Sequence, residues 1–152
     1  MSKGDTWETP DDLFESIDQH FSFELDACAN YDNAKLGTYF TEEEDALKQD
    51  WWPYKSVWMN PPYSRGNIGR FMEKALSESR KGCTVVCLVR LDPTAGWFKK
   101  YVWGKAEAVL ALGKRVRFKG ADSAYPFPSC LVVYTPTEEE KVKTYFDIWE
   151  KW

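Results

Sequence analysis

The chain has 152 residues and a formal net charge of −4 at pH 7, a length that fits one compact domain. Hydrophobic residues make up 43% and charged residues 29%, a balance that excludes a globally disordered chain. No apolar run approaches the ~20 residues that cross a bilayer, and the first ten residues are too polar for a secretory signal, so we expect a cytoplasmic protein.

Charge is distributed unevenly along the chain. Residues 1–50 contain three Lys or Arg and fourteen Asp or Glu, whereas residues 51–119 contain fourteen against four. Local potential governs contact with phosphates, so the middle of the chain is a candidate nucleic-acid interface despite the acidic total. The alternative is an ordinary solvated surface.

Cysteine and histidine exclude several kinds of chemistry. The four cysteines form no CxxC pair, and Cys83 and Cys87 lie in an apolar strand pattern, which predicts reduced, buried thiols. His20 is the only histidine. This argues against histidine-based catalytic triads and multi-histidine metal sites, so we expect no metal.

Strands and helices alternate along the chain. Thr9 is predicted to cap the first helix, with Pro10 at its first position. The predicted elements, in chain order, are a helix over 10–20, strands over 23–27 and near 39–40, a helical turn over 43–47, a strand over 56–59, a helix over 67–80, a strand over 83–89, a helix over 95–103, strands over 106–112, 115–118 and 129–134, and a C-terminal helix marked by Val142, Tyr145, Phe146 and Trp149. This alternation predicts an α/β layered sheet.

Two loops follow predicted strands and carry unusual chemistry: residues 26–30 and Asn60-Pro61-Pro62-Tyr63. Ligands of open α/β sheets bind at the carboxyl ends of strands. Each proline fixes φ and lacks an N–H, so the second turn is stiff and its carbonyls are aimed. Asn60 adds a side-chain acceptor and Tyr63 a flat ring, a set that suits an amino group on a planar ring.

Asn-Pro-Pro-Tyr after an apolar strand resembles the catalytic motif of amino-group methyltransferases that use S-adenosylmethionine. Further segments match the order and spacing of the Dam-like, phage-type DNA adenine-N6 methyltransferases, and the similarity covers roughly residues 7–135. These segments are Trp7-Glu8-Thr9-Pro10, Leu25-Asp26-Ala27-Cys28-Ala29, Ala46-Leu47 with Asp50-Trp51, Gly113-Lys114-Arg115-Val116-Arg117-Phe118 and Pro126-Phe127-Pro128-Ser129. The resemblance implies a compact Rossmann-like fold, a mixed central sheet with helices on both faces.

The resemblance also implies a binding site for S-adenosylmethionine. Thr9 and Pro10 are expected at its methionine end, Asp26 near its amino-acid or ribose part, and Asp50 beside its adenine. The full set of expected cofactor residues is Trp7, Thr9, Pro10, Asp26, Ala27, Cys28, Ala29, Asp50, Trp51 and Asn60. The acid that binds the ribose stays open among Glu42, Glu43, Glu44 and Asp45.

The implied substrate is an adenine flipped out of DNA, duplex or locally unpaired. Asn60 and the Pro61 carbonyl are expected to accept hydrogens from the N6 amine, beside Pro62, and Tyr63 to stack on the base. The expected DNA-binding residues are Arg65, Lys114, Arg115, Arg117, Phe118 and Lys119, with Phe118 on the opposite face of the base.

The sequence predicts a single methyltransferase domain over 1–152 with no separate target-recognition domain, acting as a monomer or weak homodimer. Two alternatives remain: a methyltransferase acting on RNA bases or protein glutamine, and a non-catalytic nucleic-acid-binding module of the same fold.

Overall fold

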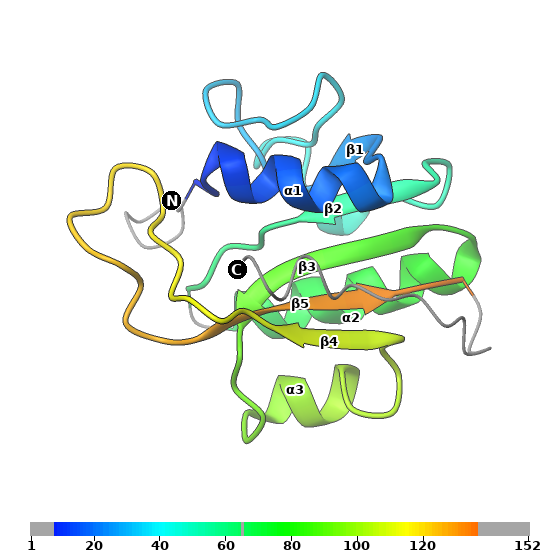
Figure 1. Cartoon of the computed structure of the whole chain (residues 1–152). Helices are drawn as coiled ribbons and strands as arrows, with labels where there is room; N and C mark the ends of the chain where they lie inside the picture. The colour runs from blue at the N-terminus through cyan, green and yellow to red at the C-terminus, as the bar shows by residue number, and fades with distance from the viewer. Residues whose placement is uncertain (1–7, 65, 137–152) are drawn as a thin grey trace.

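The computed structural model describes residues 8–64 and 66–136. Trp7, Arg65 and the predicted C-terminal helix therefore lie outside the described residues. Within them, five strands form one sheet in the order β1-β2-β3-β5-β4 (Figure 1). The strands are β1 (Leu25–Asp26), β2 (Ser56–Met59), β3 (Thr84–Arg90), β4 (Ala108–Ala111) and β5 (Ser129–Tyr134).

The sheet is mixed, as expected. β1, β2 and β3 run parallel, while β5 runs antiparallel to both of its neighbours, β3 and β4. β4 therefore points the same way as the three parallel strands. The carboxyl ends of β1 to β4 and the start of β5 consequently meet at one edge, which we call the carboxyl edge, on the left in Figure 1.

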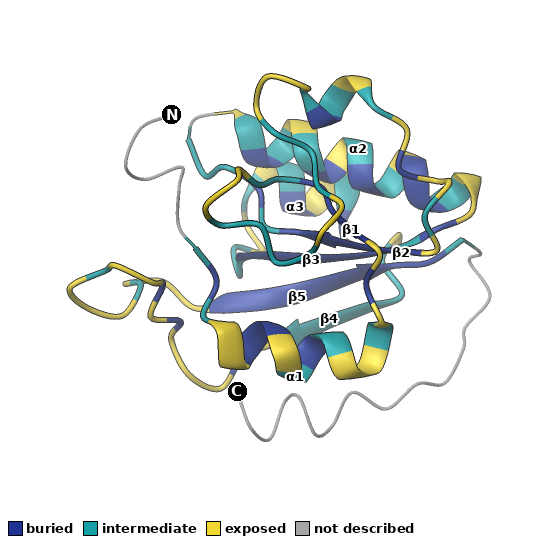
Figure 2. Cartoon of the chain, turned by 90° about the horizontal axis from the view of Figure 1, so that it is seen from above, coloured by how far each residue is buried: buried dark blue, intermediate teal, exposed yellow. Residues whose placement is uncertain are grey.

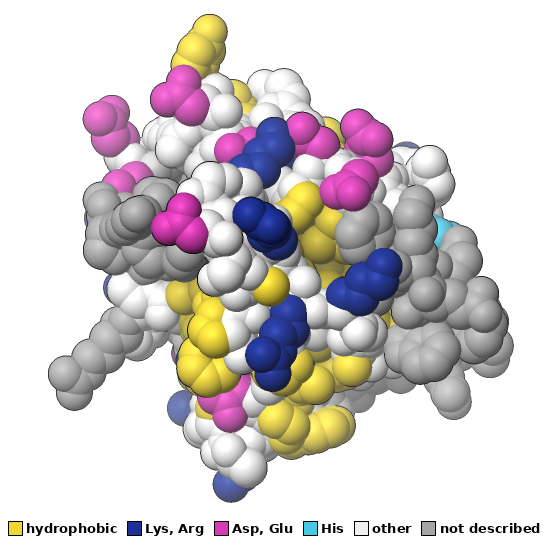
Figure 3. Space-filling view, turned by 60° about the vertical axis from the view of Figure 1, so that its left-hand side comes forward, with side chains coloured by type: hydrophobic (Ala, Val, Ile, Leu, Met, Phe, Trp, Pro, Cys, Tyr) yellow, Lys and Arg dark blue, Asp and Glu magenta, His cyan; other side chains and the backbone are white. Residues whose placement is uncertain are grey.

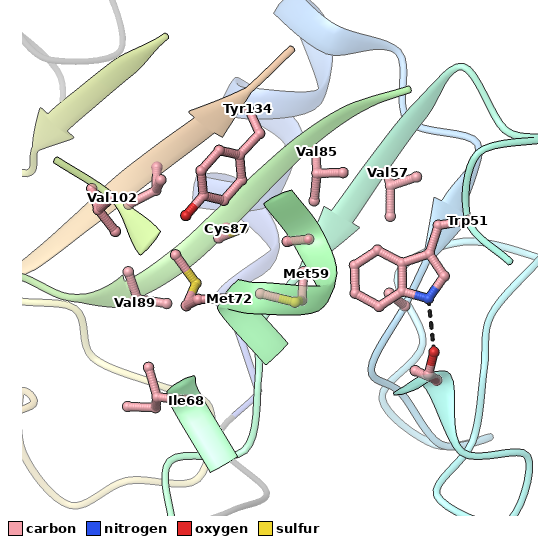
Figure 4. Packing of buried hydrophobic residues seen from close by; sticks show 14 of the residues in the cluster. Trp51, Val57, Met59, Ile68, Met72, Val85, Cys87, Val89, Val102 and Tyr134 are labelled. Atoms are coloured by element: carbon pink, nitrogen blue, oxygen red, sulfur yellow. Dashed lines mark hydrogen bonds between the residues drawn. The ribbon is translucent and has the colours of Figure 1, made fainter. Parts of the chain in front are cut away.

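Helices cover both faces of the sheet (Figure 2). α1 (Asp11–Phe21) lies on one face, and α2 (Asn67–Lys81) with α3 (Gly96–Tyr101) lies on the other. Side chains of a strand point alternately to the two faces. Thus Cys87 of β3 packs with Met59 and Met72 on the α2 side (Figure 4), and Leu88 packs with Ile17 on the α1 side. The prediction of a mixed α/β sheet with helices on both faces is confirmed, and the arrangement is consistent with a Rossmann-like methyltransferase fold.

All four cysteines are free. Cys83, Cys87 and Cys130 are fully buried, and Cys28 is partly buried. Burial raises the pKa of Cys83 and Cys130 to about 12, so these thiols stay protonated and behave as small apolar side chains.

Two local predictions are wrong. α1 begins at Asp11 after Pro10, so Thr9 does not cap it; the Thr9 hydroxyl is bonded to Asn60 instead. Residues 115–118 form no strand: Val116 and Phe118 are buried and Arg115 and Arg117 are exposed, but no neighbouring strand pairs with them. The apolar and polar side chains of this segment alternate between buried and exposed, but its backbone makes no hydrogen bonds of a β-sheet.

Five other segments are shorter than expected. The strand predicted over 23–27 is β1 (Leu25–Asp26), and the one predicted over 106–112 is β4 (Ala108–Ala111). The strand near 39–40 is a single bridge between Asp26 and Tyr39. The predicted turn over 43–47 is a 3₁₀ helix, η2 (Ala46–Lys48), and α3 spans only Gly96–Tyr101. In the described part of the chain, no helix is long and apolar enough to cross a membrane.

Candidate active site

A cavity of about 350 Å³ opens at the carboxyl edge, between the segment before α1 and the loops that follow β1 and β2. The structure brings six of the expected cofactor residues together on its wall: Thr9, Asp26, Ala27, Cys28, Ala29 and Asn60. Pro62 lies on the wall as well. The volume falls within the range of small-molecule sites.

Asp26 is the buried acid of this cavity. Its carboxylate accepts the backbone N–H of Lys35 at 3.0 Å and that of Cys28 at 3.4 Å. Burial is the largest influence on the carboxyl group and raises its pKa to about 6, although both N–H groups and the nearby Lys35 charge act in the opposite direction. The group therefore changes protonation in the weakly acidic range.

Asn60 stands at the end of β2, where the chain leaves the sheet through two prolines. Its side-chain Nδ2 donates a hydrogen bond to Thr9 Oγ1 at 3.1 Å, across 51 positions of sequence. Thr9 is 2% exposed. The amide therefore sits at the junction of the cavity with the Asn-Pro-Pro-Tyr turn.

Tyr63 closes that turn against the edge of the sheet. Its hydroxyl donates to the carbonyl of Leu88 at 3.2 Å, and its ring meets the ring of Phe118 edge to face, with centroids 6.3 Å apart and planes at 79°. Phe118 is 1% exposed. The two rings meet edge to face in this structure, so Phe118 packs against Tyr63 and supports it; its expected place on the opposite face of a base stays a prediction.

Further aromatic residues extend this cluster. Tyr125 packs against Tyr63 at 5.8 Å between centroids and against Phe127 at 5.5 Å. The guanidinium of Arg90, at the end of β3, lies 5.2 Å from the Phe127 ring centre and pairs with Asp92 at 3.2 Å. The loop 119–128 is thus fastened to β3 next to Tyr63.

Three expected cofactor residues do not line the cavity. Pro10 lies on a neighbouring groove, and Asp50 is exposed. Trp51 is fully buried behind the wall, where its indole N–H donates to the carbonyl of Ala46 at 2.9 Å (Figure 4). The residue that reaches the cavity from this segment is Ala46, together with its neighbour Leu47.

Of the four acids considered for the ribose, Glu42 and Asp45 line the cavity. Asp45 has a φ of 55°, a conformation stabilised by its own carboxylate, which accepts the N–H of Leu47 at 3.1 Å. Glu44 accepts the N–H of Thr41 at 3.1 Å, and Glu43 is exposed away from the wall.

Four charged side chains link the cavity to the downstream loop, and we call them the 8–119 charge cluster: Glu8, Asp11, Lys35 and Lys119. Lys35 lies 3.3 Å from Glu8 and 2.8 Å from Asp11; Lys119 lies 3.4 Å and 2.7 Å from the same acids. Hydrogen bonds from Lys119 and then Lys35 lower the pKa of Asp11 to about 2. Lys119, expected to bind DNA, is thus already paired with carboxylates.

The other expected DNA residues flank the site. Lys114, Arg115 and Arg117 are exposed and line a second groove of about 220 Å³ beside the start of α1. Figure 3 looks toward the carboxyl edge of the sheet: Lys and Arg run down the middle of this face beside hydrophobic patches, and Asp and Glu lie mainly along its upper part.

Sequence reasoning missed several residues at the site. Lys35, Asn33 and Phe71 line the cavity. Tyr125 packs against Tyr63, Phe127 packs against Tyr125, and Arg90 lies over Phe127. Lys35 comes from an irregular polar segment whose residues carry no periodic signal. Arg90 could have been predicted as a site residue, because it follows an apolar strand and ligands bind at the carboxyl ends of strands.

The fold and site define a class: an α/β protein whose mixed sheet holds a ligand cavity at the carboxyl edge, with an Asn-Pro-Pro-Tyr turn on its rim. Within that class, the chain belongs to the DNA N-6-adenine-methyltransferase (Dam) family, whose model matches residues 1–144. The expected family is therefore confirmed.

Individual relatives agree with this family. The DNA N-6-adenine-methyltransferase of Haemophilus phage HP1 (strain HP1c1) is 34% identical over 143 residues, covering 89% of this chain and 81% of that protein. That of Escherichia phage T1 is 30% identical over 106 residues, covering 69% and 44%. The putative methyltransferase YfdM of Escherichia coli (strain K12) is 41% identical over 66 residues, covering 40% and 72%.

Proposed function

We propose that the protein transfers a methyl group from S-adenosylmethionine to the N6 amine of an adenine in DNA, with the base flipped toward the Asn-Pro-Pro-Tyr turn. The observation that carries this proposal is the position of Asn60, which lies on the cavity wall and begins the turn that ends at Tyr63. One amide thus stands between a cofactor-sized cavity and a ring able to stack on a base.

The cavity suits S-adenosylmethionine in charge and in the apolar surface that it offers. The cofactor is cationic at its ammonium and sulfonium groups, and the wall carries four acids against the two cations Lys35 and Arg70: Glu8, Asp26, Glu42 and Asp45. The apolar side chains of Phe40, Leu47 and Phe71 offer surface for its adenine. In this proposal Asp26 holds the cationic end and Glu42 the ribose. When bound, the cofactor supplies an activated methyl group on sulfur.

The residues of the chain act on the target amine. The N6 lone pair is delocalised into the adenine ring, so the nitrogen is a weak nucleophile that offers only hydrogens. Asn60 Oδ1 and the Pro61 carbonyl accept those hydrogens and orient the nitrogen toward the cavity. Such positioning contributes on the order of 7–11 kcal/mol at best. Tyr63 stacks on the base, which leaves the duplex at a cost of a few kcal/mol.

DNA reaches the site, in this proposal, across the basic face of Figure 3. Lys114, Arg115 and Arg117 are exposed beside the carboxyl edge and are proposed to contact phosphates. Target recognition falls to loop 119–128 and its neighbours within one domain. The phage relatives point to action on DNA in the cytoplasm of a bacterial host.

The deciding experiment incubates the purified protein with S-adenosylmethionine labelled on the methyl group and with unmethylated duplex DNA, then identifies the labelled nucleoside. We expect label in N6-methyladenine for the wild type and for the remote control Lys99→Ala, and none for Asn60→Ala. Label in another nucleoside, or in RNA or protein glutamine but not DNA, would overturn the proposal. Failure to bind the cofactor would point to a non-catalytic module.

A further inference from the structure

We infer that Thr9 is a positioning residue for the transfer reaction: its hydroxyl anchors the Asn60 amide so that Oδ1 faces the target amine. This inference rests on the proposed function, because it assigns the partner that orients the proposed acceptor. It gives Thr9 a different task from the cofactor contact that the sequence resemblance implies.

The contact itself is well placed for this task. Asn60 Nδ2 donates to Thr9 Oγ1 at 3.1 Å, and Thr9 is 2% exposed, so water does not compete freely for the hydroxyl. An amide carries its donor and its acceptor on opposite sides of the Cγ atom. When Nδ2 is held by Thr9, Oδ1 is directed to the other side.

A hydroxyl is a suitable partner because its oxygen accepts the hydrogen bond that Asn60 Nδ2 donates. The target amine offers only hydrogens, so the reaction needs the amide orientation in which Oδ1 accepts. The bond between Nδ2 and Thr9 Oγ1 favours that orientation before the base arrives.

Thr9 can act as an anchor because both of its neighbours are fixed. Before it, the carbonyl of Glu8 accepts the N–H of Lys119 at 2.9 Å, which joins this segment to the downstream loop. After it, the carbonyl of Pro10 accepts the N–H of Phe14 at 3.0 Å in the first turn of α1. The loss of the N-cap function predicted for Thr9 is therefore explained: its hydroxyl serves Asn60 rather than the helix.

The test separates the maximal rate from substrate affinity. Thr9→Val keeps the shape of the side chain and removes the hydroxyl, and Thr9→Ser restores a hydroxyl. We expect Thr9→Val to lower kcat by roughly tenfold to a hundredfold, with KM for S-adenosylmethionine and for DNA within about threefold of wild type. Thr9→Ser should recover most of kcat. Thr84→Val is the matched control, because Thr84 begins β3 at the end of the strand that lies away from the site. This substitution should leave kcat unchanged.

Each alternative outcome contradicts the inference in its own way. A wild-type kcat in Thr9→Val would show that Asn60 needs no anchor. A raised KM for S-adenosylmethionine at unchanged kcat would make Thr9 a cofactor contact. If circular dichroism shows that Thr9→Val does not fold, Thr9→Ala replaces it, and its kcat and its two KM values are compared with wild type in the same way. Formation of N6-methyladenine by the wild type and by Thr9→Ser tests the proposed function separately, whatever Thr9→Val does.

Discussion

The fully buried carboxylate of Glu78 on α2 accepts the backbone N–H of Trp51 at 2.6 Å, which ties the loop before β2 to the helix that follows it. Lys81 lies 2.6 Å from the same carboxylate and Lys74 lies 3.7 Å away. Trp51 in turn holds the carbonyl of Ala46, a residue of the cavity wall. A buried charge on α2 thus helps to position the cavity wall without lining the cavity.

Glu78 should matter for stability, and its effect should depend on pH. Burial alone would raise the pKa of Glu78, but hydrogen bonds from Lys81 and the Trp51 N–H, with the charges of Lys74 and Lys81, together lower it below the ordinary value of 4.5. The stabilisation is therefore present above the unfolded-state pKa and is lost as the pH falls through the folded-state value.

We expect Glu78→Ala to lower the free energy of unfolding at pH 7 by about 1–3 kcal/mol, because the Trp51 N–H loses its acceptor inside the protein. Glu78→Gln keeps an acceptor and should cost less. Urea unfolding at pH 7 and at pH 4 measures both effects. A difference between wild type and Glu78→Gln that stays the same at both pH values would contradict the assignment of the pH dependence to this carboxylate.

Asp26 should make cofactor binding sensitive to pH. Its pKa of about 6 means that the carboxylate is ionised at pH 8 and mostly protonated at pH 5. A cationic ligand favours the ionised form, so we expect the affinity for S-adenosylmethionine to fall as the pH drops below 6, by up to about tenfold per pH unit. Titration calorimetry between pH 5 and 8 measures this dependence. Asp26→Asn should bind weakly with a flat profile, whereas an unchanged slope in that variant would assign the titration to another group.

Glu42 and Glu43 are adjacent acids that differ in their placement, and they form a matched pair. Glu42 lies on the cavity wall and Glu43 does not. We expect Glu42→Ala to raise KM for S-adenosylmethionine roughly tenfold to a hundredfold, the loss of a hydrogen bond between a ribose hydroxyl and a charged acceptor. Glu43→Ala should match the wild type. Equal effects of the two substitutions would mean that the acidic potential of the segment, rather than one carboxylate, attracts the cofactor.

How far the sequence predicts this molecule depends on the kind of signal each residue gives. The apolar runs of β2, β3 and β5 and the helical spacing of α2 identify those elements within one residue at each end. The Asn-Pro-Pro-Tyr turn points to the candidate site because it follows such a run, and its Asn60 and Pro62 do line the cavity. The periodicity of apolar residues, however, predicts which side chains are buried and not which strands form hydrogen bonds with each other. Residues 115–118 therefore have the sequence pattern of a strand but form none.

Contacts between distant segments leave no local pattern. Nothing beside Lys35 in the sequence indicates that it meets Asp11, and nothing beside Thr9 indicates that its hydroxyl meets Asn60. Trp51 is the converse case, a residue expected at the cavity that does not line it. Its segment borders the cavity, but its side chain points into the core. Side-chain direction in irregular segments is fixed by tertiary packing.

Lys119 should contribute less to DNA binding than its charge suggests. It is paired with Glu8 and Asp11, so contact with a phosphate requires exchange of one anion for another. We expect Lys119→Ala to weaken DNA binding less than Lys114→Ala. Conversely, Asp11→Asn should tighten binding and steepen the dependence of log Kd on log salt by about one unit. Fluorescence anisotropy over a range of salt concentrations measures both. A larger loss for Lys119→Ala than for Lys114→Ala would contradict this ranking.

Tyr63 offers two separable contributions, its ring and its hydroxyl. The hydroxyl donates to the Leu88 carbonyl at 3.2 Å, and burial raises its pKa, so it stays protonated at any working pH. Tyr63→Phe removes this bond and should lower the free energy of unfolding by about 1 kcal/mol. Because the ring is retained in Tyr63→Phe, the kcat and kcat/KM of this variant should remain within a few-fold of wild type.

Tyr63→Ala removes the stacking surface and should reduce kcat/KM for DNA by about tenfold or more, since stacking of a base on an aromatic ring contributes about 1–3 kcal/mol. Thermal unfolding and steady-state methylation of the two variants separate the contributions. A kcat/KM for DNA in Tyr63→Phe as low as in Tyr63→Ala would show that the hydroxyl, not the ring, serves the reaction.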